Sequence, residues 1–117
     1  MIVAHGLTGE TASYVPVENR HVEHILDTTI VPAGVSPGIA ARAGDIARRA
    51  AERLDVIGLL AVEMFVTWDG NLLVNEIAPR PHNSGHWTLD AAITSQFEQF
   101  IRAVAGLPLG DLSLIHI

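Results

Sequence analysis

The chain has 117 residues, no cysteine and a formal net charge of −6, which fits one small domain without disulfides or thiolate metal sites. The acidic balance opposes binding to nucleic acid, and no apolar run reaches the ~20 residues that cross a bilayer. We therefore expect a soluble, cytoplasmic protein. All seven basic residues are arginine. Lysine, which usually contacts phosphates in nucleotide-using enzymes, is absent.

The first third of the chain has β character. Residues 1–4 and 12–17 are strand-like, and the segment between them carries Gly6 and Gly9, which suit a hairpin connection. Residues 25–31 continue this character until the proline- and glycine-rich segment 32–38 interrupts it. These patterns predict an antiparallel meander.

Two helices follow from capping signals and apolar spacing. Ser36 and Pro37 predict a helix start, and a three-four spacing carries that helix to about Leu54, with its arginines on a solvated face. A second helix is expected near Ser95, with Glu98 completing a capping box. The buried stripe predicted for it is Ile93, Phe97, Phe100, Ile101 and Val104. The predicted fold class is α+β, an antiparallel sheet with packed helices.

Two apolar runs, 58–67 and 72–77, flank Asp69-Gly70, a pair that favours a hairpin. If those two residues form the whole loop, Glu63 lies directly opposite Glu76 in the paired strands. Asn75, the neighbour of Glu76, then points to the other face of the sheet by alternation.

Facing carboxylates in apolar strands repel each other and are costly to bury. A divalent cation between Glu63 and Glu76 removes both problems, and oxygen ligands suit Mg²⁺ or Mn²⁺. Two other interpretations remain open from spacing alone. Both side chains point into water, or the two carboxyls share one proton.

The segment 75–86 concentrates polar side chains between prolines that fix its backbone. Arg80 suits a carboxylate, bicarbonate or phosphate. Hydrogen bonds to a substrate are expected from His82, Asn83 and Ser84. His82 and His86 have the spacing of a helical zinc pair, but Pro81 and Gly85 oppose a helix, so zinc is disfavoured.

The runs 58–66, 75–86, 94–99 and 106–110 together resemble the ATPase subunit of phosphoribosylaminoimidazole carboxylase, an ATP-grasp enzyme. The resemblance also includes 14–21 and 25–27, so it covers nearly all of residues 1–111. It implies the C-terminal lobe of an ATP-grasp domain, from a longer enzyme that is expected to be a homodimer.

By this resemblance Glu63 and Glu76 would bind the magnesium of Mg-ATP, while His21 and Asn75 would lie at the nucleotide site. The segment 80–84 would face bicarbonate and aminoimidazole ribonucleotide, with Arg80 as a catalytic residue. The implied reaction uses ATP to activate bicarbonate as carboxyphosphate, whose carboxyl passes to the substrate amine. One departure is His5, where the family usually has arginine.

Two alternatives remain. A formate-dependent glycinamide ribonucleotide transformylase shares the Pro-Arg-Pro-His run, although residues 83–86 favour the carboxylating enzyme. The other is a non-catalytic remnant. Because the family's other domains and its lysines are missing, we expect the isolated chain to be inactive. Residues 1–111 are expected to form the partial domain, and residues 112–117 resemble a translated sequencing adapter and are expected to be non-native.

Overall fold

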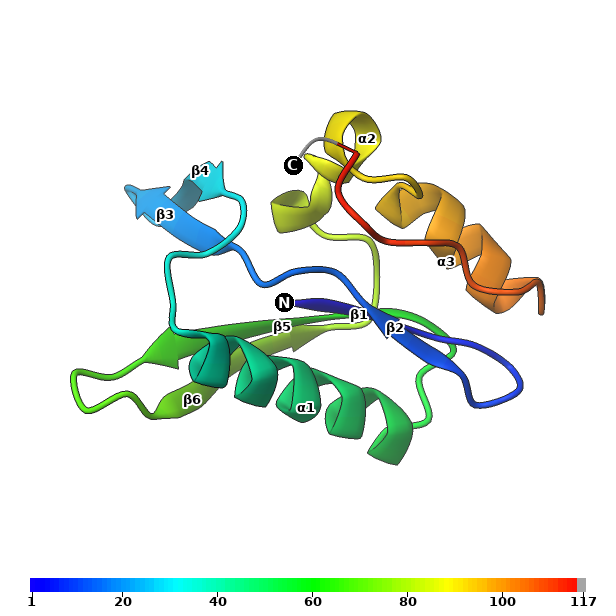
Figure 1. Cartoon of the computed structure of the whole chain (residues 1–117), viewed down its shortest axis with the longest axis horizontal. Helices are drawn as coiled ribbons and strands as arrows, with labels where there is room; N and C mark the ends of the chain where they lie inside the picture. The colour runs from blue at the N-terminus through cyan, green and yellow to red at the C-terminus, as the bar shows by residue number, and fades with distance from the viewer. Residues whose placement is uncertain (116–117) are drawn as a thin grey trace.

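The computed structural model describes residues 1–115 and has the α+β class expected from the sequence (Figure 1). The strands are β1 (Ile2–His5), β2 (Thr11–Ser13), β3 (Glu18–Val22), β4 (Ile25–Ile30), β5 (Gly58–Val66) and β6 (Leu72–Ala78). The helices are α1 (Pro37–Arg53), α2 (Thr88–Ala91) and α3 (Gln96–Val104), with a 3₁₀ turn, η1 (Asn83–Gly85). None of the helices in this described part is long and apolar enough to cross a membrane.

The main sheet has four strands in the order β2-β1-β5-β6, and its three pairings are antiparallel. The predicted hairpin between the first two strands is present, but β2 ends at Ser13 rather than continuing to residue 17. Pro16 follows, and a proline cannot donate to a strand ladder. The sequence did not predict β3, which pairs with β4 in a separate two-stranded sheet.

Helix α1 covers one face of the main sheet, as Figure 1 shows. Its start is capped as predicted, because Ser36 Oγ accepts a hydrogen bond from the Ile39 amide at 3.2 Å. The small residues Ala47 and Ala51 face the sheet and pack against Val3, Leu60 and Val62. Small side chains let the helix approach the strands closely.

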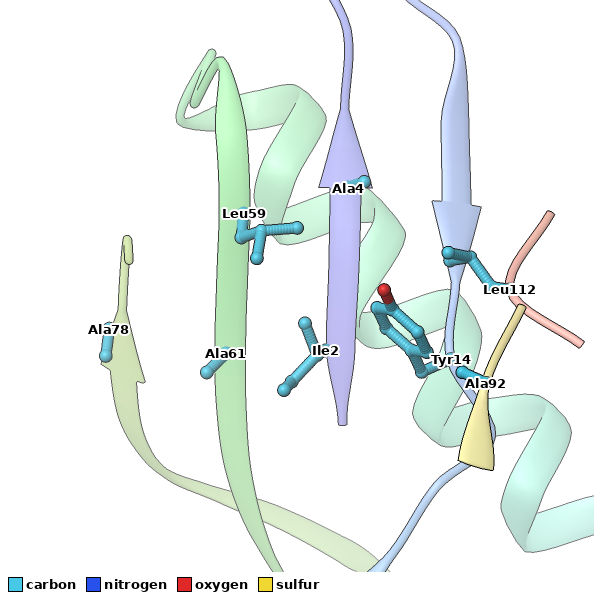
Figure 2. Close-up of a cluster of buried hydrophobic side chains, with 8 residues drawn as sticks. All are labelled: Ile2, Ala4, Tyr14, Leu59, Ala61, Ala78, Ala92 and Leu112. Atoms are coloured by element: carbon cyan, nitrogen blue, oxygen red, sulfur yellow. The ribbon is translucent and has the colours of Figure 1, made fainter. Parts of the chain in front are cut away.

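The opposite face of the sheet carries a second cluster of buried side chains (Figure 2). Its members come from strands β1, β5 and β6 and from the segments around them: Ile2, Ala4, Tyr14, Leu59, Ala61, Ala78, Ala92 and Leu112. The Tyr14 hydroxyl donates to the Thr94 carbonyl at 2.8 Å, which ties the end of β2 to the segment before α3. This cluster anchors the irregular segment that follows β6.

Helix α3 begins where expected, since Ser95 Oγ accepts from the Glu98 amide at 3.2 Å. The stripe predicted to be buried was wrong, because Ile93, Phe97, Ile101 and Val104 are exposed and Phe100 is only partly buried. The buried residues of α3 are Gln96, Gln99 and Ala103. Both glutamine side chains find backbone partners in other segments, so polar groups occupy the inner side of this helix.

Part of the C-terminal segment packs against the domain. Leu112 belongs to the buried cluster, the Ser113 carbonyl accepts from the Ile93 amide at 2.9 Å, and Leu114 forms a β-bridge with Ala92. Residues 116–117 lie outside the described part of the chain. The expectation that residues 112–117 are non-native stays a prediction.

Candidate functional site

The β5–β6 hairpin carries the candidate site, and its loop differs from the predicted one. The Thr67 amide donates to the Asn71 carbonyl at 2.9 Å, which leaves a loop of three residues rather than two. Gly70 in this loop has φ of +82°, a conformation that glycine adopts without strain. Asp-Gly pairs suit both loop lengths, so the sequence did not distinguish between them.

A β-bulge then changes the register within the hairpin. Met64 pairs with Val74, but the next residue of β5, Glu63, pairs with Glu76. One extra residue of β6, Asn75, is therefore accommodated between the two pairs. The predicted opposition of Glu63 and Glu76 is confirmed, although the loop assumed for it was wrong, because the bulge offsets the longer loop.

The bulge also decides where Asn75 points. Asn75 Nδ2 lies 3.5 Å from Glu63 Oε2, so its side chain lies beside the acidic pair. The prediction from strict alternation, which placed Asn75 on the opposite face, was wrong. Alternation slips by one residue at a bulge, and here this slip brings an amide donor to a carboxylate.

His82 contacts the other oxygen of the same carboxylate. Its Nε2 atom lies 3.5 Å from Glu63 Oε1. Its Nδ1 atom accepts from the Ser84 amide at 3.2 Å and lies 2.8 Å from Ser84 Oγ. In the neutral ring the proton is therefore on Nε2, the atom that faces Glu63.

Burial lowers the pKa of His82, and the nearby Arg80 guanidinium lowers it as well, against the opposing effects of Glu63 and Glu76. The lowered pKa favours the neutral imidazole, so His82 Nε2 and Glu63 Oε1 form a 3.5 Å polar contact and not a hydrogen-bonded ion pair.

A cavity of about 380 Å³ adjoins Glu63. Its polar lining includes Glu63, Asn75, Glu18, Asn19 and His21, the last three from β3. The remaining wall is mostly apolar and comes from β5, from α1 and from the segments beside it, including Val35, Ile39, Ala43, Val62 and Met64. Three of the residues predicted from the sequence therefore share one cavity: His21, Glu63 and Asn75.

Glu76 is exposed and lies at the margin of this arrangement, opposite Glu63 but outside the cavity lining. Within residues 1–115 no group of three or more His, Cys, Asp or Glu side chains is placed to hold a metal ion. Glu63 and Glu76, which pair across the two strands, offer two carboxylates, and Mg²⁺ commonly takes one or two protein carboxylates and completes its shell with phosphate oxygens and water. The donor set therefore fits a shared ion.

The remaining predicted residues lie along the segment after β6. Arg80 is exposed and donates from Nη1 to the Pro81 carbonyl at 2.9 Å. Asn83 is exposed, whereas Ser84 is buried with its hydroxyl against His82. His86 stacks on Phe97 at 5.8 Å between ring centroids, and its Nδ1 atom lies 3.3 Å from Gln96 Nε2.

Gln96 was given no role from the sequence, yet it contacts His82 directly. Its Oε1 atom accepts from the His82 amide at 2.9 Å, and its Nε2 atom donates to the His82 carbonyl at 2.8 Å. A side chain on Gly85 would collide with the Gln96 amide, so this glycine makes the approach possible. The available signal was a glutamine directly after the N-cap of the predicted helix.

The model of the ATP-grasp domain family matches residues 1–97. The chain is 56% identical over 115 residues to N5-carboxyaminoimidazole ribonucleotide synthase of Bacillus subtilis, covering 98% of this chain and 30% of that protein. Among solved structures, an ADP complex of an N5-carboxyaminoimidazole ribonucleotide synthetase matches with a TM-score of 0.95 at 49% identity, over 97% of this chain and 30% of that one.

A second solved structure is the Aspergillus clavatus N5-carboxyaminoimidazole synthase in complex with ADP and 5-aminoimidazole ribonucleotide. It matches with a TM-score of 0.92 at 36% identity, over 97% of this chain and 31% of that one. The chain thus spans about 30% of the length of the relatives that it matches.

Proposed function

The chain belongs to the ATP-grasp family, and we propose that it forms the cation- and nucleotide-binding part of a ligase that carboxylates aminoimidazole ribonucleotide in purine biosynthesis. The observation that carries the proposal is the opposition of Glu63 and Glu76 beside a cavity lined by His21 and Asn75. Relatives with ADP, and with ADP plus 5-aminoimidazole ribonucleotide, support the choice of ligands.

In this proposal Glu63 and Glu76 bind one Mg²⁺ or Mn²⁺ together with phosphate oxygens of ATP. The bound cation would supply neutralisation of the charge that develops on the transferred phosphoryl group. Asn75 and His82 each donate toward one oxygen of Glu63 and so keep its carboxylate oriented. The apolar wall of the cavity excludes water from one side of the nucleotide.

The proposed reaction has two steps. A bicarbonate oxygen attacks the γ-phosphorus of ATP, ADP leaves, and carboxyphosphate forms; the amine of aminoimidazole ribonucleotide then takes the carboxyl group and releases phosphate. The exposed guanidinium of Arg80 is available to an anionic intermediate or to bicarbonate. Asn83, also exposed, is available to the ribonucleotide.

The formyl-transferring rival would use the same cation site and a different acyl donor. The relatives described above are carboxyaminoimidazole ribonucleotide synthases, which favours bicarbonate. Homodimer formation and a cytoplasmic location belong to the proposal for the longer enzyme and are not needed for the cation site.

The test is titration of the chain with Mn²⁺ in the presence of ADP, followed by electron paramagnetic resonance of the free ion. We expect Glu63→Gln and Glu76→Gln each to raise the Kd for Mn²⁺ at least about tenfold, the scale of a lost metal contact. Glu23→Gln, an equal charge change at an exposed turn, is the matched control. Equal Mn²⁺ affinity in all four proteins would refute the site.

A further inference from the structure

Two buried glutamines on α3 each form two hydrogen bonds with the backbone of a residue in another segment. Gln96 bonds both the amide and the carbonyl of His82, at 2.9 and 2.8 Å. Gln99 does the same to Gly110, accepting from its amide at 2.7 Å and donating to its carbonyl at 3.3 Å. Neither glutamine is exposed. A buried side-chain amide whose oxygen and nitrogen are both hydrogen-bonded to one residue restricts the position of that residue.

The two glutamines differ in the residue whose backbone they bond. Gly110 belongs to the C-terminal segment, whereas His82 carries the imidazole that faces Glu63. The His82 ring is fixed at its other side by Ser84. Its position relative to Glu63 therefore depends on a backbone held by Gln96 and on a ring held by Ser84.

The surroundings fix Gln96 in turn. Its own amide donates to Thr88 Oγ1 at 2.9 Å, and Thr88 Oγ1 donates to the Gly85 carbonyl at 2.6 Å. Gly85 leaves the space that the Gln96 side chain occupies. A helix that carries no predicted site residue is thereby linked rigidly to the candidate site.

We propose that Gln96 is a positioning residue for the cation site: by holding both backbone groups of His82, it sets the placement of His82 Nε2 against Glu63 Oε1. The expected effect on cation binding rests on the proposed function, because Glu63, the carboxylate that His82 contacts, is the one proposed to bind the cation. It adds a residue that touches neither cation nor substrate. Its action passes through His82.

The test compares Gln96→Met with Gln99→Met. Each substitution removes a side-chain amide, and with it two hydrogen bonds to the backbone of another segment, while it keeps nearly the same side-chain volume. Two measurements are made at pH 7.5. The first is the ¹⁵N spectrum of the His82 imidazole in the metal-free chain, which reports its tautomer and its order. The second is the Kd for Mn²⁺ with ADP present.

Gln96→Met is expected to replace the single Nε2–H tautomer of His82 with an averaged signal, and to raise the Kd for Mn²⁺ about tenfold, as loss of an outer-shell partner does. Gln99→Met should leave both quantities as in the wild type. Gln96→Asn, which keeps the amide but is too short to bond both groups, should act as Gln96→Met does and replaces it if that variant does not fold.

An unchanged His82 spectrum in Gln96→Met, or equal changes in Gln96→Met and Gln99→Met, would overturn the proposal. The spectrum separates this inference from the proposed function. If the wild-type chain binds no Mn²⁺, the cation site fails, whereas the effect of Gln96 on the imidazole is still decided by the metal-free measurement.

Discussion

Glu63 and Glu76 face each other but differ in their contacts. Both oxygens of Glu63 have a donor nearby, Asn75 Nδ2 on one side and His82 Nε2 on the other. Glu76 is exposed and contributes mainly charge. The two residues therefore play different parts in the metal-free protein even if they bind one cation together.

This difference predicts opposite effects of two equal substitutions on metal-free stability. Glu63→Gln places an amide donor against an existing donor and should lower the free energy of unfolding by about 1 kcal/mol. Glu76→Gln removes like-charge repulsion and should leave stability unchanged or raise it by up to about 1 kcal/mol. Urea unfolding at pH 7.5 with EDTA measures both. A loss in Glu76→Gln equal to that in Glu63→Gln would contradict the assignment.

The lowered pKa of His82 predicts a pH dependence of stability. The unfolded chain takes up a proton on this residue near its ordinary pKa of about 6.5, before the folded chain does. Stability should therefore be full above that pH and fall as the pH drops through it. The charged groups that act on the ring are Glu63, Glu76, Arg80 and the N-terminal ammonium of Met1.

Urea midpoints between pH 7.5 and 5.5, with EDTA present, test this dependence. We expect His82→Gln to flatten the slope, whereas His24→Gln, at an exposed turn, should keep it. The same slope in His82→Gln and wild type would show that other groups cause the dependence.

At the scale of elements, the β5–β6 hairpin depends on one residue of its loop. Gly70 has φ of +82° with open space around its Cα. Gly70→Ala should therefore destabilise the chain by about 1 kcal/mol through backbone strain alone. Gly34→Ala is the control, because Gly34 also has open space but no positive φ. Thermal unfolding of both variants measures the difference, and equal Tm values would contradict the strain.

The sequence predicted the strands of this hairpin correctly, but not its loop length or its bulge. Apolar runs around Asp-Gly identified both strands and the facing pair, Glu63 and Glu76. It did not reveal the bulge at Asn75, because an extra residue in one strand leaves the hydrophobic pattern of a largely apolar run unchanged. The opposition was correct because the longer loop and the bulge each shift the register by one residue, in opposite directions.

Helix α3 shows another limit of sequence analysis. Its start was predicted from a local signal, the Ser95 cap. Its buried side was not, because the partners of Gln96 and Gln99 lie 14 and 11 residues away in the chain. A hydrophobic pattern assumes that apolar side chains face inward, and this assumption fails when buried amides have backbone partners.

At the scale of the whole molecule, the chain spans about 30% of the relatives that it matches and contains no lysine. We therefore expect the isolated chain to have no carboxylase activity, because it has no lysine to bind the phosphates of ATP.

Phosphate release from ATP, measured with bicarbonate and aminoimidazole ribonucleotide, checks this expectation. The wild-type chain should match a Glu76→Ala control. Phosphate release faster than that of the Glu76→Ala control, and dependent on both bicarbonate and aminoimidazole ribonucleotide, would contradict the expectation. It would show that these residues suffice for turnover.

The bulge also has a consequence for amide hydrogen exchange. In the described residues β6 is an edge strand, with β5 on one side only. Amides that point toward β5 are protected from exchange, while those that point away exchange with water, so protection alternates along the strand. Because Asn75 inserts one residue between the pairs of Val74 and Glu76, this alternation should change phase at Asn75. Amide exchange rates measured along β6 alone would therefore locate the bulge beside the candidate site.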